Sequence, residues 1–287
     1  MNYADKNTRR PGAFLLQAFF LLAKSSWILP AFSFLVIFLL VPLLFLFLES
    51  FRFAGSWSLA NYFRVFSMPI FLTAFARTLK LSALVTLCAA VFSYPAAWAI
   101  SSSRRRNFLL SLFVLPLLTN PVARTYTWLV ILGRYGMVNS MVLALGLTSE
   151  PLRILYTETA VFLGLLQLFL PYMVLSLVSA IENMPPDVIE AAYSLGASPF
   201  KTFWKVIFPL TREGLLFGGT VVFCGCVTAY VTPAMLGGTR ILTLATLLYQ
   251  RTMYFMQWAE GMVIAVVMML TTLLMYRLLL IGQKRTI

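Results

Sequence analysis

The stretch Thr159–Ile181, which reads TAVFLGLLQLFLPYMVLSLVSAI, contains no charged residue. A helix needs roughly 20 apolar residues to cross the hydrocarbon core of a bilayer. The apolar residues run on without the alternation of apolar and polar positions that is typical of a strand in a membrane β-barrel. The stretch therefore predicts a transmembrane helix.

Further apolar stretches on both sides extend this prediction. Trp27–Leu48, Leu81–Ile100 and Gly214–Gly238 contain no charge, whereas the stretch at 108–132 is interrupted by Arg124. We therefore expect an all-α polytopic membrane protein whose membrane domain occupies residues 27–281. Its six spans are predicted at about 27–48, 75–100, 108–132, 159–181, 214–238 and 260–281.

The composition excludes several other classes of protein. The 287 residues are 61% hydrophobic and only 11% charged, whereas about 25% of the residues of soluble domains are charged. The net charge of +13 would suggest a nucleic-acid partner in a soluble protein. Here the Lys and Arg residues lie mainly between apolar stretches, where they set membrane orientation. A water-soluble enzyme, a secreted disulfide-rich domain and a disordered chain are excluded.

The reactive side chains also argue against chemistry on this chain. There is no histidine, the commonest general base and metal ligand. Cys88, Cys224 and Cys226 fall inside apolar stretches, where free thiols pack as small apolar side chains. We therefore expect no disulfide, no metal site, no catalytic residue and no enzyme activity.

The Lys and Arg residues predict the orientation of the chain. More of them fall on the side of the N-terminus, and the triplet Arg104–Arg106 directly follows a span. Because cytoplasmic loops are enriched in Lys and Arg, both termini are expected in the cytoplasm. Residues 1–26 would form a cytoplasmic segment. Its short apolar stretch Ala13–Ala23 lies either in the membrane interface as a helix or in a tilted extension of the first span.

The segment 182–213 is the one long polar insertion on the predicted cytoplasmic side. Pro185–Pro186 and Ser198–Pro199 favour two helix starts, since proline fits the first turn of a helix. Gly196 can end the first of these helices in the left-handed conformation. Pro209 is expected to end the second helix before the next span. The segment thus predicts a helix–turn–helix on the membrane surface.

Several residues of this segment resemble the EAA motif of ABC importer permeases. The motif reads EAA, three residues, Gly, nine residues and I-x-L-P. It corresponds here to Glu190-Ala191-Ala192, Gly196 and Val206-Ile207-Phe208-Pro209. Val206 and Phe208 replace the usual Ile and Leu, so both positions stay apolar. Three more stretches, at 145–156, 170–175 and 231–238, are similar to the B-type permease of spermidine/putrescine importers.

The resemblance implies the type I ABC importer permease fold. It also implies a permease subunit that forms half of the pathway for a small solute, such as the polyamines spermidine and putrescine. The residues that would couple this chain to an ATPase are Glu190, Ala191, Ala192, Gly196 and Pro209. In this family the short EAA helix sits in a groove of the ATPase. The small Ala side chains allow close approach, and Glu190 offers a carboxylate to an arginine there.

The same resemblance implies the partners. These are a homologous C-type permease subunit, two ATPase subunits, an external solute-binding protein and the lipid bilayer of a bacterial inner membrane, with no nucleic acid. The chain contains no G-x-x-x-x-G-K-[ST] phosphate loop, so ATP and Mg would be used by the ATPase and this chain would carry no cofactor. Two alternatives stay open: an importer of another small solute (amino-acid-like, opine or phosphonate), and a membrane scaffold without transport.

Polar and aromatic residues within the spans are candidates for the solute path. Pro171 and Pro233 each free a backbone carbonyl one turn back, and such breaks are tolerated where they line a cavity. The candidates are Asn120, Trp128, Gln167, Tyr172, Thr228, Tyr230 and Thr232. Each polar one can instead make an interhelical hydrogen bond. Since no Asp or Glu lies near the middle of a span, a cation would meet mainly aromatic rings there.

Overall fold

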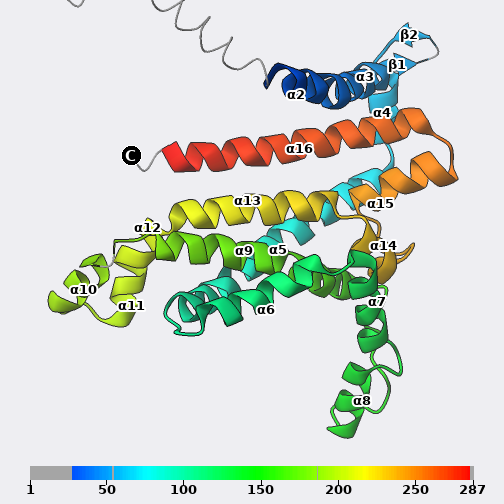
Figure 1. Ribbon diagram of the computed structural model, residues 1–287. Coiled ribbons are helices and arrows are strands. Elements are labelled where there is room, and N and C mark those ends of the chain that lie inside the picture. Colours follow the sequence, from blue (N-terminus) through cyan, green and yellow to red (C-terminus); the bar gives the residue numbers. More distant parts are fainter. Residues whose placement is uncertain (1–27, 54, 186, 285–287) are drawn as a thin grey trace, which may run out of the picture.

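The structure is a computed structural model that describes residues 28–53, 55–185 and 187–284. Long helices lie side by side in layers, with short helices at both ends of the bundle (Figure 1). The interfacial helix expected at 13–23 and the first residue of the first span lie outside the described residues. Within them the chain is helical apart from loops and one two-stranded hairpin. The predicted all-α polytopic class is thus confirmed.

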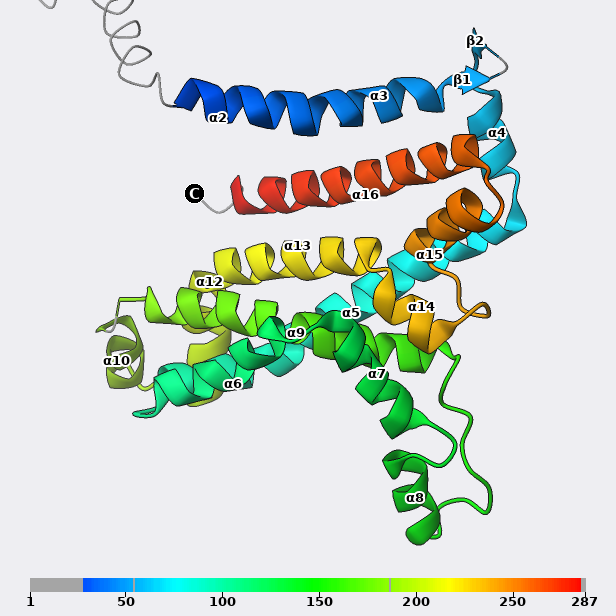
Figure 2. The same cartoon turned by 45° about the vertical axis from the view of Figure 1, so that its right-hand side comes forward.

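The first layer is the pair formed by the N-terminal and C-terminal spans. Helix α2 (Ile28–Leu35) continues through a π-helical turn (Val36–Leu40) into α3 (Val41–Ser50), which packs beside α16 (Trp258–Lys284). Figure 2 shows this pair along one face of the bundle. The antiparallel strands β1 (Arg52–Phe53) and β2 (Ser56–Trp57) then lead into the short α4 (Ala60–Phe66).

Three helices form the centre of the bundle. They are α5 (Pro69–Ser101), α9 (Glu158–Glu182) and α13 (Arg212–Thr228), which pack against one another through fully buried apolar side chains. Val85 of α5, Val174 of α9 and Val222 of α13 are among these. Glycines allow the closest approach: a Cβ atom on Gly218 would lie 2.8 Å from the sulfur of Met173. The small residues of α13 thus let it pack closely against α9.

The stretch expected as one span at 108–132 is two helices. Helix α6 (Arg106–Leu118) ends before Thr119, and α7 (Pro121–Leu132) starts after Asn120, whose backbone is extended. The break has a local cause, because proline disfavours the helical conformation in the residue before it. Asn120 then caps α7 by accepting a hydrogen bond from the Val122 amide at 2.8 Å. Beyond α7 the short α8 (Met137–Ala144) stands away from the bundle (Figure 2).

The remaining short helices flank the central ones. Helices α10 (Asp187–Ser194), α11 (Pro199–Thr202) and α12 (Phe208–Leu210) follow α9 at one end, whereas α14 (Val231–Gly237) and α15 (Leu244–Tyr249) lie at the opposite end (Figure 1). Five described helical stretches are long and apolar enough to cross a membrane, and two of them, 32–50 and 121–144, combine consecutive helices named above. A sixth crossing results if α13 counts with the helical segment Pro199–Leu210, from which it is bent by 67°.

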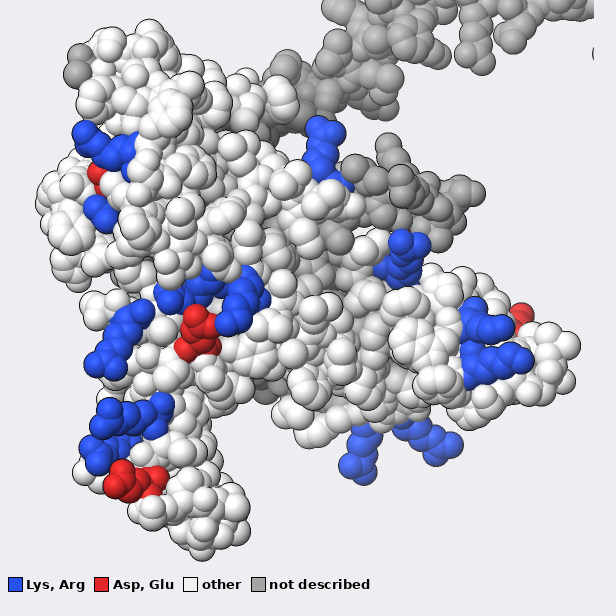
Figure 3. Space-filling view, turned by 180° about the vertical axis from the view of Figure 1, so that it is seen from behind, with Lys and Arg blue, Asp and Glu red and all other residues white. Residues whose placement is uncertain are grey.

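Charged side chains gather at the two ends of the bundle. Seen from behind, Lys and Arg cluster at the end that carries α8 and α15, and a second group lies toward the other end (Figure 3). Arg104 and Lys201 belong to the end with α10, and Arg134 and Arg240 to the opposite end. Such a distribution suits a bundle whose middle is embedded in a bilayer.

Candidate functional site

The EAA-like residues form an exposed helical elbow at one end of the molecule. Helix α10 ends at Ser194, and the turn that closes it contains Gly196 in the predicted left-handed conformation, with a φ of +75°. The Gly196 amide donates to the carbonyl of Tyr193 at 2.9 Å, and the Ala197 amide donates to that of Ala192 at 3.0 Å. This pair of bonds is a Schellman motif, which satisfies carbonyls at the helix end. The turn therefore ends α10 and connects it to α11.

The side chains of this elbow are available to a partner. Glu190 and Ala191 are exposed and Ala192 is half-buried. Within the described residues Glu190 forms no ion pair. A carboxylate beside small side chains on a protruding helix suits docking into a groove of another protein.

The second helix of the elbow continues beyond the expected end at Pro209. Ser198 caps α11, and a π-helical turn (Phe203–Ile207) carries the chain into α12, which includes Pro209. The bend to α13 comes at Thr211 instead. Pro209 is tolerated because it stands in the first turn of α12, where its missing N–H costs little.

An aromatic cavity of about 580 Å³ lies between the elbow and α5. Its lining includes Tyr94 and Trp98 of α5 and Phe203, Trp204 and Phe208 of the elbow. The Tyr94 ring meets that of Phe203 edge to face at 5.3 Å between centroids. These contacts attach the elbow to a central helix. Sequence reasoning missed them, although the density of aromatic residues at 200–208 was a signal.

A second cavity, of about 720 Å³, opens between α9 and α13 in the half of the bundle near the elbow. We call it the inner cavity. On α9 it is lined by Tyr172, Ser176, Ser179 and Asn183, and on α13 by Glu213 and other residues. Of the seven path candidates, only Tyr172 is part of this lining. Ser176, Ser179 and Asn183 could also have been found from the sequence. They follow Tyr172 at spacings of four, three and four residues, which place all four on one face of a helix.

The path candidates near α7, and Gln167 of α9, do not line the inner cavity. Asn120 is the cap of α7, as described above. Trp128 is half-buried and packs against the central apolar cluster. Gln167 of α9 is half-buried. Arg124, the charge inside the predicted third span, donates to the carbonyl of Pro116 at 2.6 Å and so bridges the break between α6 and α7.

The candidates between α13 and α14 are separated by a second break. Helix α13 ends at Thr228 and Ala229 is extended, so Thr228 and Thr232 stand on separate helices although they are only four residues apart. Thr228 is exposed, whereas Thr232 is buried and lies 3.2 Å from the Thr125 hydroxyl of α7. For Thr232 the structure thus gives the alternative role, an interhelical hydrogen bond. Tyr230 is exposed, and its ring packs against that of Tyr249 with 4.7 Å between centroids and a tilt of 38°.

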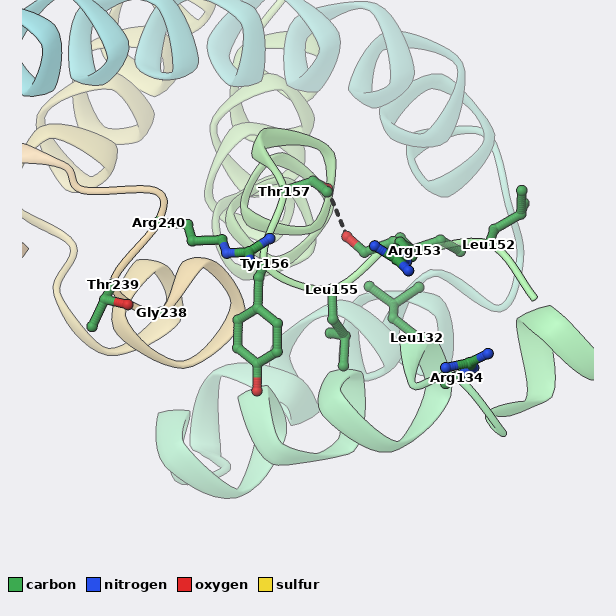
Figure 4. Close-up of a pocket in the computed structure, with 11 residues that line it drawn as sticks. Leu132, Arg134, Leu152, Arg153, Leu155, Tyr156, Thr157, Gly238, Thr239 and Arg240 are labelled. Atoms are coloured by element: carbon green, nitrogen blue, oxygen red, sulfur yellow. Dashed lines mark hydrogen bonds between the residues drawn. The ribbon is translucent and has the colours of Figure 1, made fainter. Parts of the chain in front are cut away.

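A third cavity, of about 540 Å³, opens at the end opposite to the elbow. Its lining holds Arg134, Arg153 and Arg240, from three separate loops (Figure 4). Figure 4 shows Arg134 and Arg153 on one side of Tyr156 and Arg240 on the other. Tyr156 has a positive φ of 60° and packs against Gly238, where a Cβ would lie 2.9 Å from its ring. We call this the arginine pocket, and it can accept anionic groups.

Comparison with protein families gives a match over residues 89–286 to the family described as "Binding-protein-dependent transport system inner membrane component". The chain is similar to the "Spermidine/putrescine transport system permease protein PotB" of Haemophilus influenzae. The two are 34% identical over 244 residues, which cover 82% of this chain and 85% of that protein. The protein of the same description from Escherichia coli is 31% identical, with 71% of this chain and 75% of that protein covered.

Solved structures share the fold at lower identity. A bacterial ABC transporter involved in the import of the acidic polysaccharide alginate has a chain with a TM-score of 0.74 and 16% identity. The match covers 97% of this chain and 98% of that one. A chain of the MetNI methionine ABC transporter has a TM-score of 0.57 and 16% identity, with coverage of 77% and 99%. Both likenesses concern the fold alone.

Proposed function

Because the chain belongs to the family of binding-protein-dependent transport system inner membrane components and is an ABC importer permease, we propose that its solute is a polyamine such as spermidine or putrescine. The observation that carries this proposal is the similarity, over 82% of the chain, to a permease described as part of a spermidine/putrescine transport system. The chemistry of the inner cavity agrees with a cationic solute, since its lining includes Tyr172 and Glu213 but no Lys or Arg.

The energy for transport would come from a separate ATPase. The relatives are transport permeases rather than enzymes. Glu190, Ala191, Ala192 and Gly196 form the surface that docks to it, and Pro209 supports the elbow behind that surface. ATP and Mg are then bound by the ATPase, and this chain needs no cofactor.

The remaining partners follow from the two ends of the bundle. The elbow faces the cytoplasm, where ATP is available, so both termini are cytoplasmic. The arginine pocket then faces outward and suits carboxylates on a solute-binding protein better than it suits a cationic solute. A homologous permease subunit completes the pathway, since one chain supplies only one side of it.

Reconstitution tests this function. The chain would be co-expressed with the ATPase, second permease and binding protein encoded beside it, and uptake of labelled spermidine and putrescine into proteoliposomes would be measured. We expect ATP-dependent uptake that requires the binding protein. Replacing Tyr172 and Tyr230 with Leu should reduce uptake more than stimulated ATP hydrolysis. Uptake restricted to an anionic solute would refute the polyamine proposal, and a complex without uptake of any solute would favour a scaffold.

A further inference from the structure

The acidic residues at the ends of the long helices are nearly all neutralised by basic side chains. Glu158 of α9 accepts hydrogen bonds from Arg77 at 2.9 Å and from Lys80 at 2.8 Å. At the other end of α9, Glu182 pairs with Arg106 through two bonds. Similar pairs join Glu49 to Arg52, and Glu260 to both Arg64 and Arg251. Pairing of this kind is what a charge near a bilayer normally requires.

Glu213 is the exception among these helix ends. It is in the first turn of α13, is exposed, and lines the inner cavity. In the part of the chain that the structure describes it has no ion-pair partner. The cavity that it faces also has no Lys or Arg in its lining. A carboxylate without a cation therefore stands in a cavity of about 720 Å³.

The other residues of the inner cavity suit an organic cation. Tyr172 and Phe217 offer aromatic rings, and a cation is attracted to the face of such a ring. The side chains of Ser179 and Asn183 add polar atoms that can accept hydrogen bonds from an ammonium group. The Ser176 hydroxyl is already used, since it donates to the carbonyl of Gly214 at 2.6 Å. One charge, two rings and a few polar atoms resemble a weak site rather than a tight one.

We propose that the inner cavity is a binding site for an organic cation, in which the Glu213 carboxylate holds an ammonium group that also meets the ring of Tyr172. The identity of the physiological occupant, a polyamine in transit to the cytoplasm, rests on the proposed function. Cation binding itself rests on the cavity. The site supplies the carboxylate that the sequence lacks near the middle of any span, and supplies it at the inner end of the path.

Thiol labelling can test the site without relying on transport. In the assembled importer, with Cys88, Cys224 and Cys226 replaced by Ala, Ser179→Cys puts a thiol into the cavity wall. Inverted vesicles expose it to a cationic trimethylammonium methanethiosulfonate and to an anionic sulfonate analogue. For each variant, the rate of labelling by the cationic reagent is divided by the rate for the anionic one, and both rates are normalised to those of free cysteine. Ser102→Cys, which lies outside the cavity, is the reference. We expect the ratio for Ser179→Cys to be about tenfold higher than the ratio for Ser102→Cys, because a charged cleft concentrates counter-ions.

The variants at position 213 decide the proposal. Glu213→Gln should abolish the excess of cationic over anionic labelling at Ser179→Cys, and Glu213→Asp should keep it. Added spermidine should slow the cationic labelling only in proteins that keep a carboxylate at position 213. Glu49→Gln is the matched control and should change nothing. An unchanged ratio in Glu213→Gln, or an equal fall at Ser102→Cys, would overturn the site. If the ratio behaves as expected but the wild-type importer takes up no polyamine, the proposed solute fails while the cation site stands.

Discussion

The hydroxyl oxygen of Tyr94 lies 3.1 Å from that of Thr211, which joins the central helix α5 to the bend before α13. Thr211 already donates to the carbonyl of Ile207 at 2.8 Å, so Tyr94 is the donor in the pair. The Tyr94 ring also contacts Phe203 and Phe208 of the elbow. Tyr94 therefore connects the elbow to α5 through both a hydrogen bond and ring contacts.

Tyr94→Phe removes the hydrogen bond and keeps the ring. A neutral hydrogen bond contributes about 0.5–1.5 kcal/mol to the free energy of unfolding. The melting temperature of the solubilised protein should therefore fall only slightly. The solute imported per ATP hydrolysed should fall, because the elbow is held less firmly to α5. Tyr135→Phe, at an exposed position, is the control. If Tyr94→Phe imports as much solute per ATP hydrolysed as the wild type, the hydrogen bond between Tyr94 and Thr211 plays no part in coupling.

Gly196 and Glu190 should be needed for coupling but not for membrane insertion. Gly196→Val places a β-branched residue at φ +75°, which costs about 1–2 kcal/mol for a left-handed residue. Since no atom lies within 4 Å of its Cβ position, strain is the whole effect, and Gly196→Asn should be tolerated better. Glu190→Lys should weaken binding of the ATPase, measured by co-purification. Normal uptake by both Gly196→Val and Glu190→Lys would refute the coupling role.

Two glycines of α13 should respond in opposite ways to alanine. At Gly214 the new Cβ would lie 2.4 Å from the Ala180 Cβ, so α9 and α13 must separate, whereas at Gly219 the nearest atom is 3.6 Å away. We expect Gly214→Ala to destabilise the protein by about 1–3 kcal/mol, as overpacking does. Gly219→Ala should be neutral or stabilising by up to about 1 kcal/mol, since glycine disfavours a helix. Thermal unfolding in detergent measures both, and equal melting temperatures would contradict the packing described.

The arginine pocket should contribute to docking of the binding protein. Exposed charge pairs contribute about 0.2–1 kcal/mol each. Replacing Arg134, Arg153 and Arg240 with Gln should therefore weaken binding by about threefold to a hundredfold. The loss should shrink at high salt because exposed charges are screened. Arg52→Gln, which removes an arginine already paired with Glu49, is the control. Equal affinities measured at low salt would exclude this pocket from the interface.

The orientation can be measured with fused reporters. A reporter after residue 287 or within 183–198 should read as cytoplasmic, and one within 136–150 as external, because the inner side carries more Lys and Arg. An external reading for the elbow would overturn the orientation and the coupling role together, since ATP is available only inside.

Local features of the sequence determined much of this protein. Charge-free stretches such as Thr159–Ile181 predicted helices because a bilayer admits few other backbone structures. Gly196 predicted a left-handed helix end, which the structure confirms. These predictions needed only neighbouring residues, because hydropathy, proline and glycine act over one or two turns. The EAA-like motif also lies within one short segment, and its residues and spacing indicated the family of ABC importer permeases.

The tertiary structure decided which distant residues meet. Nothing near Thr232 in the sequence indicates that its hydroxyl meets that of Thr125. The break after Thr228 likewise places Thr228 and Thr232 on separate helices, although they are only four residues apart. Arg134, Arg153 and Arg240 come together only because three loops end at one side of the bundle. Glu213 lines the inner cavity without an ion-pair partner among the described residues, whereas Glu158 and Glu182 are paired with basic side chains of other helices. Charge pairing depends on distances between helices, and those distances are set by packing that no single segment encodes.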